Sequence, residues 1–184
     1  MTSKVGNIRM TRTKQALIDA FGELINEKSF EKITILDLTK KAQINRATFY
    51  AHFKDKYELM DHTIGDSAHT TILNHTNGVV AFNHETISQL LFAVCGYYQQ
   101  FQEKCKRSDV VMTTPLLKDK MIKALKEYLS KCLKNDYTER ERELYIPIYA
   151  NIIYEAGYLW RTEQVLFERE ELANKIAVLM LSNA

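Results

Sequence analysis

The chain has 184 residues, of which 46% are hydrophobic, 25 are Lys or Arg and 23 are Asp or Glu. This composition excludes a wholly disordered chain, and the length suffices for one or two domains with a buried core. With only six Gly and two Pro, the chain lacks the turn residues of an all-β protein, so we expect an all-α fold.

The N-terminal third is basic, with 11 Lys or Arg against 7 Asp or Glu in residues 1–60, whereas residues 61–184 carry 14 against 16. Positive charge gathered at one end favours a polyanionic partner such as nucleic acid. Basic N-termini are common, so the charge alone does not decide between partners.

Four helices are predicted in the N-terminal part of the chain. The first has apolar residues on one face at three- and four-residue spacing. Thr34, with Asp37 three positions later, marks the start of the second, and Asn45 is suited to cap the third. The predicted ranges are 11–27, 35–42, 46–53 and 55–74.

The third of these helices has an unusual composition for a helix that only faces solvent. Core packing takes Phe49 and Phe53, and the side chains left on other faces are Arg46, Ala47, Thr48, Tyr50 and His52. Two short helices joined by a tight turn, the second rich in hydrogen-bond donors, are typical of a helix-turn-helix that enters the major groove of DNA. A small helical hairpin with no DNA partner is the alternative.

Residues 12–59 resemble the DNA-binding domain of tetracycline-repressor (TetR) type regulators. The resemblance is carried mainly by the run Ile33-Thr34, by Ala42-x-Ile44-Asn45 and by Ala47-Thr48-Phe49-Tyr50-x-His52-Phe53-x-Asp55-Lys56. Two positions depart from the family pattern. Thr39 stands where Ala is typical, and Gln43 stands where the turn usually has Gly, so Gln43 has to adopt a left-handed backbone conformation.

The resemblance implies individual roles in DNA binding. Thr34, Tyr50 and Lys56 match positions that contact phosphates, and Arg12 is a further phosphate candidate. The positions expected to face base edges are Arg46, Thr48 and His52. Arg46 has the geometry to pair with guanine, and the Thr48 methyl group suits a thymine methyl. The implied function is repression by promoter occlusion, with activation left open.

The rest of the chain is predicted to be helical, which gives about nine helices in total. The expected ranges are His84 to Lys106, Pro115 to Leu133, Thr138 to Trp160 and Glu168 to Leu181. Pro147 either kinks the third of these or starts its main segment. We expect a helix-turn-helix domain in residues 1–57 and an effector-binding and dimerisation domain in residues 58–184.

The last two helices are apolar on most sides, which predicts that they are buried. In the resembled family the corresponding helices pair with their copies in a four-helix bundle. A homodimer is therefore expected, with an interface that contains Ile152, Ala156, Trp160, Ile176 and Met180. A larger monomeric core is the alternative.

Aromatic side chains of the C-terminal part suit a cavity for a small-molecule effector, since tyrosine supplies both an apolar ring and a polar tip. The candidates are Phe92, Tyr97, Phe101, Tyr128 and Tyr149, for which core packing is the simpler alternative. His62, Asp66 and His69 are spaced to share a helical face, but a polar face without a metal is the favoured interpretation. No metal or cofactor is expected.

Enzymatic motifs are not found. The sequence has no GxGxxG, P-loop, HExxH or CxxC pattern, so we expect no enzyme. An odd number of cysteines (Cys95, Cys105 and Cys132), with no signal-like N-terminus and no sufficiently apolar segment, favours a cytoplasmic protein without a membrane span. The alternative function is a helical protein-interaction module whose basic N-terminus binds an acidic partner.

Overall fold

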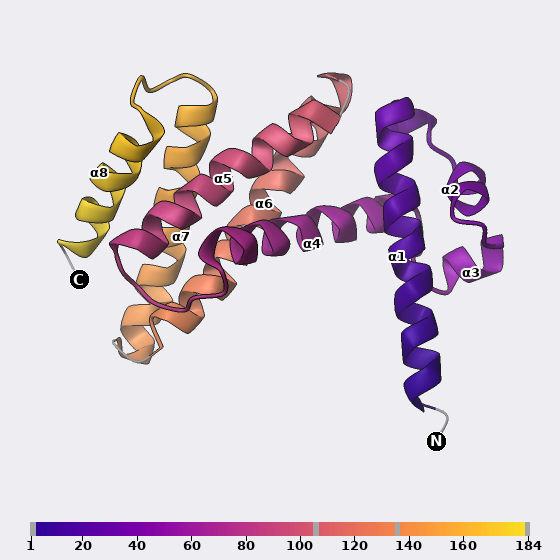
Figure 1. Cartoon of the computed structure of the whole chain (residues 1–184), viewed down its shortest axis with the longest axis horizontal. Coiled ribbons are helices and arrows are strands. Elements are labelled where there is room, and N and C mark those ends of the chain that lie inside the picture. Colours follow the sequence, from indigo (N-terminus) through magenta and orange to yellow (C-terminus); the bar gives the residue numbers. More distant parts are fainter. Residues whose placement is uncertain (1–2, 105–106, 135–136, 183–184) are drawn as a thin grey trace. The chain divides into compact units, whose positions relative to one another are not determined.

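A computed structural model describes residues 3–104, 107–134 and 137–182, and their side chains except in residues 3–11, 99–104 and 107–114. Within these ranges the chain forms eight α-helices and one short 3-10 helix, η1, with no strand (Figure 1). The all-α prediction is therefore confirmed. The elements are α1 Ser3–Glu27, η1 Phe30–Lys32, α2 Ile35–Lys41, α3 Arg46–Tyr50, α4 Lys56–Thr76, α5 His84–Lys104, α6 Arg107–Cys132, α7 Glu139–Arg161 and α8 Arg169–Leu181.

The helices divide into two compact units. The first consists of Met1–Ile64 with Phe101–Thr114, and the second of Gly65–Gln100 with Pro115–Ala184. Helix α4 contributes residues to both units, and the domain boundary expected after residue 57 falls in its first turn. That boundary remains a prediction.

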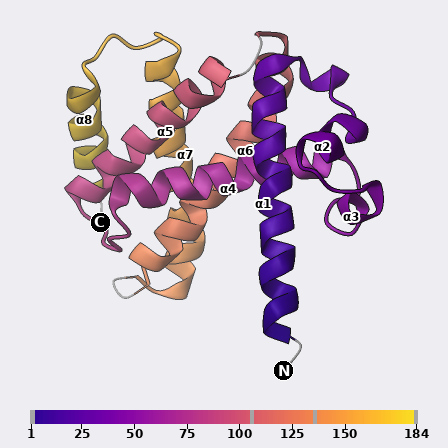
Figure 2. The same cartoon turned by 45° about the vertical axis from the view of Figure 1, so that its right-hand side comes forward.

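In the first unit, α2 and α3 lie along one side of α1 (Figures 1 and 2). The apolar face of α1 supplies four members of the buried core, and the short helices and the start of α4 supply the rest. This core consists of Leu17, Phe21, Leu24, Ile25, Phe30, Ile33, Leu38, Phe49, Phe53 and Leu59. Because α2 and α3 are too short to be stable alone, their burial against α1 is what keeps them helical.

In the second unit, α8 lies beside α5 and α7 (Figure 1). A cluster at this contact consists of Leu91, Cys95, Ala156, Leu172 and Ala173, with the half-buried Phe92, Trp160, Val165 and Ile176 packed against it. Burial raises the pKa of the Cys95 thiol to about 11. Cys95 therefore acts as a small apolar residue in this cluster.

The two prolines lie inside helices. The prediction that a helix starts at Pro115 is wrong, because α6 begins at Arg107 and continues through this proline. Proline removes one backbone donor and favours the first turn, but it does not prevent a helix from starting earlier. Pro147 lies inside α7, where Asn151 Nδ2 donates to its carbonyl oxygen at 2.7 Å.

The ends of α7 and α8 agree with the predicted start signals. Thr138 caps α7, accepting a hydrogen bond from the Glu141 N–H while its own N–H donates to the Glu141 carboxylate. Glu168 precedes the first residue of α8. Among the helices that the structure describes, none has an apolar stretch long enough to cross a membrane.

Helices α5 and α7 approach closely at Gly157. A Cβ atom at this position would lie 2.7 Å from Val94 Cγ1 and 2.9 Å from Val94 Cβ. Val94 is fully buried, so it has little room to move away. The contact between these two helices therefore requires the absence of a side chain at residue 157.

We expect Gly157→Ala to lower the free energy of unfolding by about 1–3 kcal/mol, because the added methyl group forces Val94 or the backbone to shift. Gly22→Ala is the matched control, since a Cβ at Gly22 in α1 meets nothing within 4 Å. The control should be neutral or stabilising by up to about 1 kcal/mol. Urea unfolding, followed by circular dichroism and by the fluorescence of the single tryptophan, Trp160, measures both. Equal effects of the two substitutions would contradict this account.

Candidate nucleic-acid interface

The turn between α2 and α3 has the backbone conformation that the sequence predicts. Gln43 has φ of 55°, in the left-handed region, which confirms the conformation expected at this position. The N–H of Ile44 donates to the Thr39 carbonyl at 3.0 Å and closes the turn. Thr39 is buried, and its hydroxyl donates to the Leu36 carbonyl at 3.2 Å. A threonine is therefore accommodated here without an unsatisfied polar group.

Helix α3 is fixed at its N-terminus by Asn45. The Asn45 Oδ1 atom accepts hydrogen bonds from the Thr48 N–H at 2.7 Å and from the Thr48 hydroxyl at 2.9 Å. This is the expected cap, and it also determines the orientation of the Thr48 side chain. Because the hydroxyl donates to Asn45, the Thr48 methyl group is what remains for a contact with a base.

The two faces of α3 differ sharply in exposure. Phe49 is fully buried, whereas Arg46 and Ala47 are exposed and Tyr50 retains 53% of its accessible surface. His52, which follows the C-cap residue Ala51, is half-buried. The helix therefore presents a cation, a small apolar side chain and a phenol on one surface, which is chemistry suited to the edges and phosphates of a duplex.

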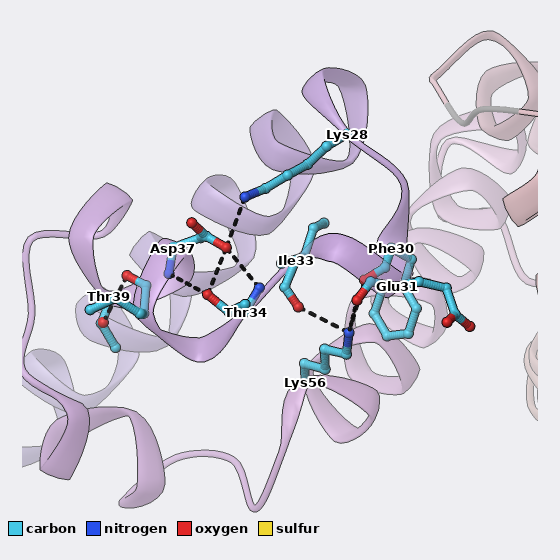
Figure 3. A network of polar contacts seen from close by, with 9 residues as sticks. Lys28, Phe30, Glu31, Ile33, Thr34, Asp37, Thr39 and Lys56 are labelled. Carbon is cyan, nitrogen blue, oxygen red and sulfur yellow. Dashed lines mark hydrogen bonds and ion pairs between the residues drawn. The ribbon is translucent and has the colours of Figure 1, made fainter.

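The start of α2 is held by a polar network around one carboxylate oxygen (Figure 3). Asp37 Oδ2 accepts hydrogen bonds from the Thr34 N–H at 2.8 Å and from the Thr34 hydroxyl at 2.7 Å, and it lies 2.8 Å from Lys28 Nζ. The Lys28 ammonium, followed by the two Thr34 donors, holds the pKa of the Asp37 carboxyl well below its usual range. Thr34 is exposed, but a phosphate contact by its hydroxyl requires the bond to Asp37 to break.

Lys56 has its contacts within the protein. Its Nζ atom donates to the carbonyl oxygens of Phe30, Glu31 and Ile33 at 2.9, 3.0 and 2.9 Å (Figure 3). The ammonium also lies 4.6 Å from the centroid of the Phe30 ring. The sequence signal for Lys56 was its match to a phosphate-contacting position, and these carbonyl contacts have no signal in the sequence. A phosphate contact by Lys56 remains a prediction.

The other basic and histidine candidates lie in different settings. Arg12 is exposed, as a phosphate contact requires. The His62 ring packs edge-on against Phe53 with centroids 5.7 Å apart, and His69 Nε2 lies 3.2 Å from a Glu127 carboxylate oxygen. Within the described residues, no three His, Cys, Asp or Glu side chains gather where they could hold a metal ion.

The aromatic side chains that are expected to bind a ligand make separate contacts within the second unit. Tyr128 donates a hydrogen bond to the Val79 carbonyl, and the Tyr149 ring stacks on Phe82 at 5.2 Å. Tyr97 is buried, and Arg169 lies over the ring of the half-buried Phe92 at 4.4 Å. Phe101 lies outside the residues whose side chains are described. Their role in binding an effector stays a prediction.

Sequence reasoning did not single out the hydroxyl pair in the same unit. The hydroxyl groups of Tyr98 and Tyr154 form a buried hydrogen bond, and Tyr158 stacks on Tyr154 with ring centroids 6.1 Å apart. The three rings come from α5 and α7. Their aromatic character was visible in the sequence, but the pairing depends on how the two helices are aligned.

Most residues expected at a dimer interface pack against other residues of the same chain. Ala156 and Met180 are 8% and 1% exposed, and Trp160 and Ile176 pack against the α5–α7–α8 cluster. Ile152 is half-buried. The apolar side chains that α7 and α8 leave exposed are different ones: Leu144, Ile148, Val178 and Leu179.

Comparison with known proteins agrees with this geometry. Residues 14–63 match the model of the bacterial regulatory proteins of the tetR family. This segment is therefore similar to the DNA-binding part of tetR-family regulators. The uncharacterised HTH-type transcriptional regulator YxbF of Bacillus subtilis (strain 168) is 41% identical over 75 residues, which are 38% of this chain and 20% of the relative. A second HTH-type regulator, from Haemophilus influenzae, is 38% identical over 53 residues, so no more than 26% of either relative is spanned.

Solved structures share the fold of this chain over nearly its whole length. The TetR family repressor AlkX from Dietzia sp. strain DQ12-45-1b has a TM-score of 0.60 at 14% identity, covering 92% of this chain and 94% of that one. A TetR transcriptional regulator from Streptococcus agalactiae 2603V has a TM-score of 0.56 at 20% identity, covering 97% and 99%. At these identities the likeness concerns the fold alone.

The network around Asp37 makes the stability of the first unit depend on pH. The charged carboxylate is favoured in the folded state, so its contribution is complete above about pH 4, the ordinary pKa of Asp, and is lost as the pH falls toward the lowered folded value. We expect Asp37→Asn to reduce the free energy of opening of α2 by roughly 1 kcal/mol at pH 7. The difference from the parent protein should narrow below about pH 4.

Amide hydrogen exchange of α2 across a pH series measures this difference. Lys28→Met is the companion variant, because Lys28 is the main cause of the lowered pKa of Asp37. Lys28→Met should lose most of the pH-dependent part of the free energy of opening of α2. A difference between Asp37→Asn and the parent protein that stays constant down to pH 2 would show that the charge of Asp37 contributes nothing.

Proposed function

We propose that this protein is a sequence-specific transcriptional regulator, not an enzyme, that binds operator DNA in the cytoplasm through α3. The observation that carries the proposal is the exposed surface of Arg46, Ala47 and Tyr50 on a helix anchored by the buried Phe49. The net positive charge of residues 1–60 supports a polyanionic partner at the same end of the chain.

Within this proposal, the side chains divide into two roles. Arg46, the Thr48 methyl group and His52 read base edges, and the fork of the Arg46 guanidinium suits the O6 and N7 atoms of guanine. Arg12, Thr34 and Tyr50 contact phosphates and so fix the register of α3 without reading sequence.

Selection of binding sites from a random duplex library tests this function. For the parent protein we expect a short recognised sequence to be enriched. Arg46→Ala should relax discrimination at one base pair of each half-site at a cost of roughly 1–3 kcal/mol, while binding to random duplexes changes little. Arg140→Ala, which removes an exposed arginine at the start of α7, is the control and should leave the selected sequence unchanged.

Two results would count against these assignments. If Arg46→Ala lost affinity equally for selected and random duplexes, Arg46 would be a phosphate ligand. If the parent protein enriched no sequence, the DNA-binding proposal would fail, and the helical protein-interaction module would take its place.

We propose that the protein acts as a homodimer through the exposed faces of α7 and α8. Leu144 and Ile148 on α7 are 57% and 44% exposed, and Val178 and Leu179 on α8 are 56% and 52% exposed. Ile152 lies one turn beyond Ile148. Four large apolar side chains on two neighbouring helices favour burial against a second copy. Two copies of α3 would then meet successive major grooves about 34–36 Å apart.

Ile148→Asp and Val178→Asp should each produce monomers, because a charge is costly at the centre of an apolar interface. Sedimentation velocity measures the oligomeric state. Leu73→Asp, which changes a 51% exposed leucine of α4, is the control and should remain dimeric. A monomeric parent protein, or dimers in both interface variants, would contradict this interface.

We further propose that a small-molecule effector binds the second unit and releases the operator. Phe92, Tyr97, Phe101, Tyr128 and Tyr149 are its candidate contacts. The fold supports this, since the regulator FadR from Bacillus subtilis, solved in complex with stearoyl-CoA, has a TM-score of 0.51 at 15% identity. Release requires the effector to bind the DNA-incompetent state more tightly. Repression is the mode proposed, as for AlkX, although the operon activator DhaS has the same fold with a TM-score of 0.58.

A further inference from the structure

The Lys56 ammonium occupies a cage of backbone carbonyls. An ammonium group has three hydrogens to donate, and three carbonyl oxygens, those of Phe30, Glu31 and Ile33, lie within 3.0 Å of Nζ. The Phe30 ring covers the cation from a further side, with Nζ 4.6 Å from its centroid. All the donors of Lys56 are therefore used inside the first unit.

The cage lies at the C-terminal end of η1, where carbonyl groups lack helical partners. Only the Phe30 carbonyl has a backbone partner there, the N–H of Ile33 at 3.1 Å. The partial negative charges of these converging carbonyl oxygens favour a cation between them. Because Lys56 is half-buried, transferring one of its hydrogens to a DNA phosphate would leave a carbonyl of the cage without its donor.

The cage also connects the two segments that border the helix-turn-helix. Ile33 directly precedes Thr34, the cap of α2, and Lys56 is the first residue of α4, which follows α3. The side chains of Phe30 and Ile33 are buried in the same core as Phe49. The bonds from Lys56 therefore hold the chain on both sides of α2 and α3 at fixed positions.

We propose that Lys56 is a positioning residue for DNA reading: already in the free protein, its ammonium clamps the carbonyls of Phe30, Glu31 and Ile33 and thereby fixes α3. The proposal rests on the proposed DNA-binding function. It separates two roles that the same positive charge could have, because a phosphate ligand acts only when DNA is bound, whereas the clamp acts in the free protein as well.

Lys56→Met tests the clamp, because it keeps the apolar stem and removes the ammonium. Lys54→Met is the matched control. Lys54 is exposed, and its substitution removes the same charge two residues away from Lys56. Lys56→Arg keeps the charge, but a planar guanidinium does not direct three donors to three converging carbonyls. We expect Lys56→Arg to retain the function of Lys56 only in part.

The first measurement is amide hydrogen exchange of η1 and α2 in the full chain without DNA. Lys56→Met should exchange about tenfold faster or more, as expected for the loss of charge-assisted hydrogen bonds, while Lys54→Met should match the parent protein. Unfolding of the N-terminal unit in Lys56→Met alone would support the clamp equally, because removing a phosphate ligand does not destabilise a free protein. Unchanged exchange in Lys56→Met would overturn the proposal, even if the protein bound no DNA.

The second measurement is affinity for the selected and for a random duplex as a function of salt. If Lys56 positions α3, Lys56→Met should lower the ratio of selected to random affinity by about tenfold, with an unchanged salt dependence. A loss of folded protein would lower both affinities alike and leave the ratio constant. If Lys56 acts only through a phosphate, both affinities should fall together with a constant ratio, and the slope of log K against log salt should decrease by about 0.9, which would overturn the proposal.

Failure of the DNA-binding function gives a different result. In that case the parent protein binds no duplex selectively, and only the exchange measurement decides whether the clamp exists. A normal parent protein with Lys56→Met indistinguishable from Lys54→Met in every measurement would refute the clamp and leave the DNA-binding function intact.

Discussion

The burial of Phe49 is the constraint on which the reading surface depends. Helix α3 has only five residues, too few to be stable by its own backbone hydrogen bonds. Its helical state is maintained by packing of Phe49 into the core shared with α1 and by the Asn45 cap. Once Phe49 points inward, helical geometry places Arg46, Ala47 and Tyr50 outward. The burial of Phe49 therefore determines which side chains are available for the proposed contact with DNA.

Polar contacts complement this core at the ends of the short elements. The capping box of Thr34 and Asp37 satisfies backbone donors at the start of α2, and Lys56 satisfies carbonyls at the end of η1. A short helix has a high proportion of unsatisfied end groups, so such contacts stabilise it more than they would a long helix. The apolar core sets where α2 and α3 lie, and the end contacts set where they begin and end.

Local signals in the sequence were sufficient for most of the first unit. Asn45 and Thr34 cap as predicted, and the left-handed backbone of Gln43 follows from the absence of a glycine in the turn. The role of Lys56 was not visible in this way. Its partners are backbone carbonyls more than twenty positions away, and carbonyls carry no sequence signature. The match to a family position predicts a phosphate contact in a DNA complex, and it does not predict these contacts in the free protein.

The second unit was harder to predict because its helices are apolar on several sides. Periodicity predicts that Ala156 and Met180 are buried, but it does not distinguish burial against α5 from burial against another chain. Within one chain these two side chains are buried, whereas Ile148 and Val178, which the sequence did not single out, are exposed. The helix start predicted at Pro115 was wrong for a related reason. The preference of proline for a first turn is statistical, and the start of α6 depends on the residues before Pro115.

The clamp at Lys56 also affects how α4 can respond to a twist about its axis. The first turns of α4 are tied to η1 by three hydrogen bonds, so a twist applied to this end carries the start of α2 with it. The two compact units divide between Ile64 and Gly65, and glycine is the residue least able to stiffen a helix. Only the flexible side chain of Lys120 lies within 4 Å of a Cβ built at Gly65. Gly65 is therefore the position along α4 that most easily accommodates a twist, and the clamp keeps Lys56 and the start of α2 together on the N-terminal side of it.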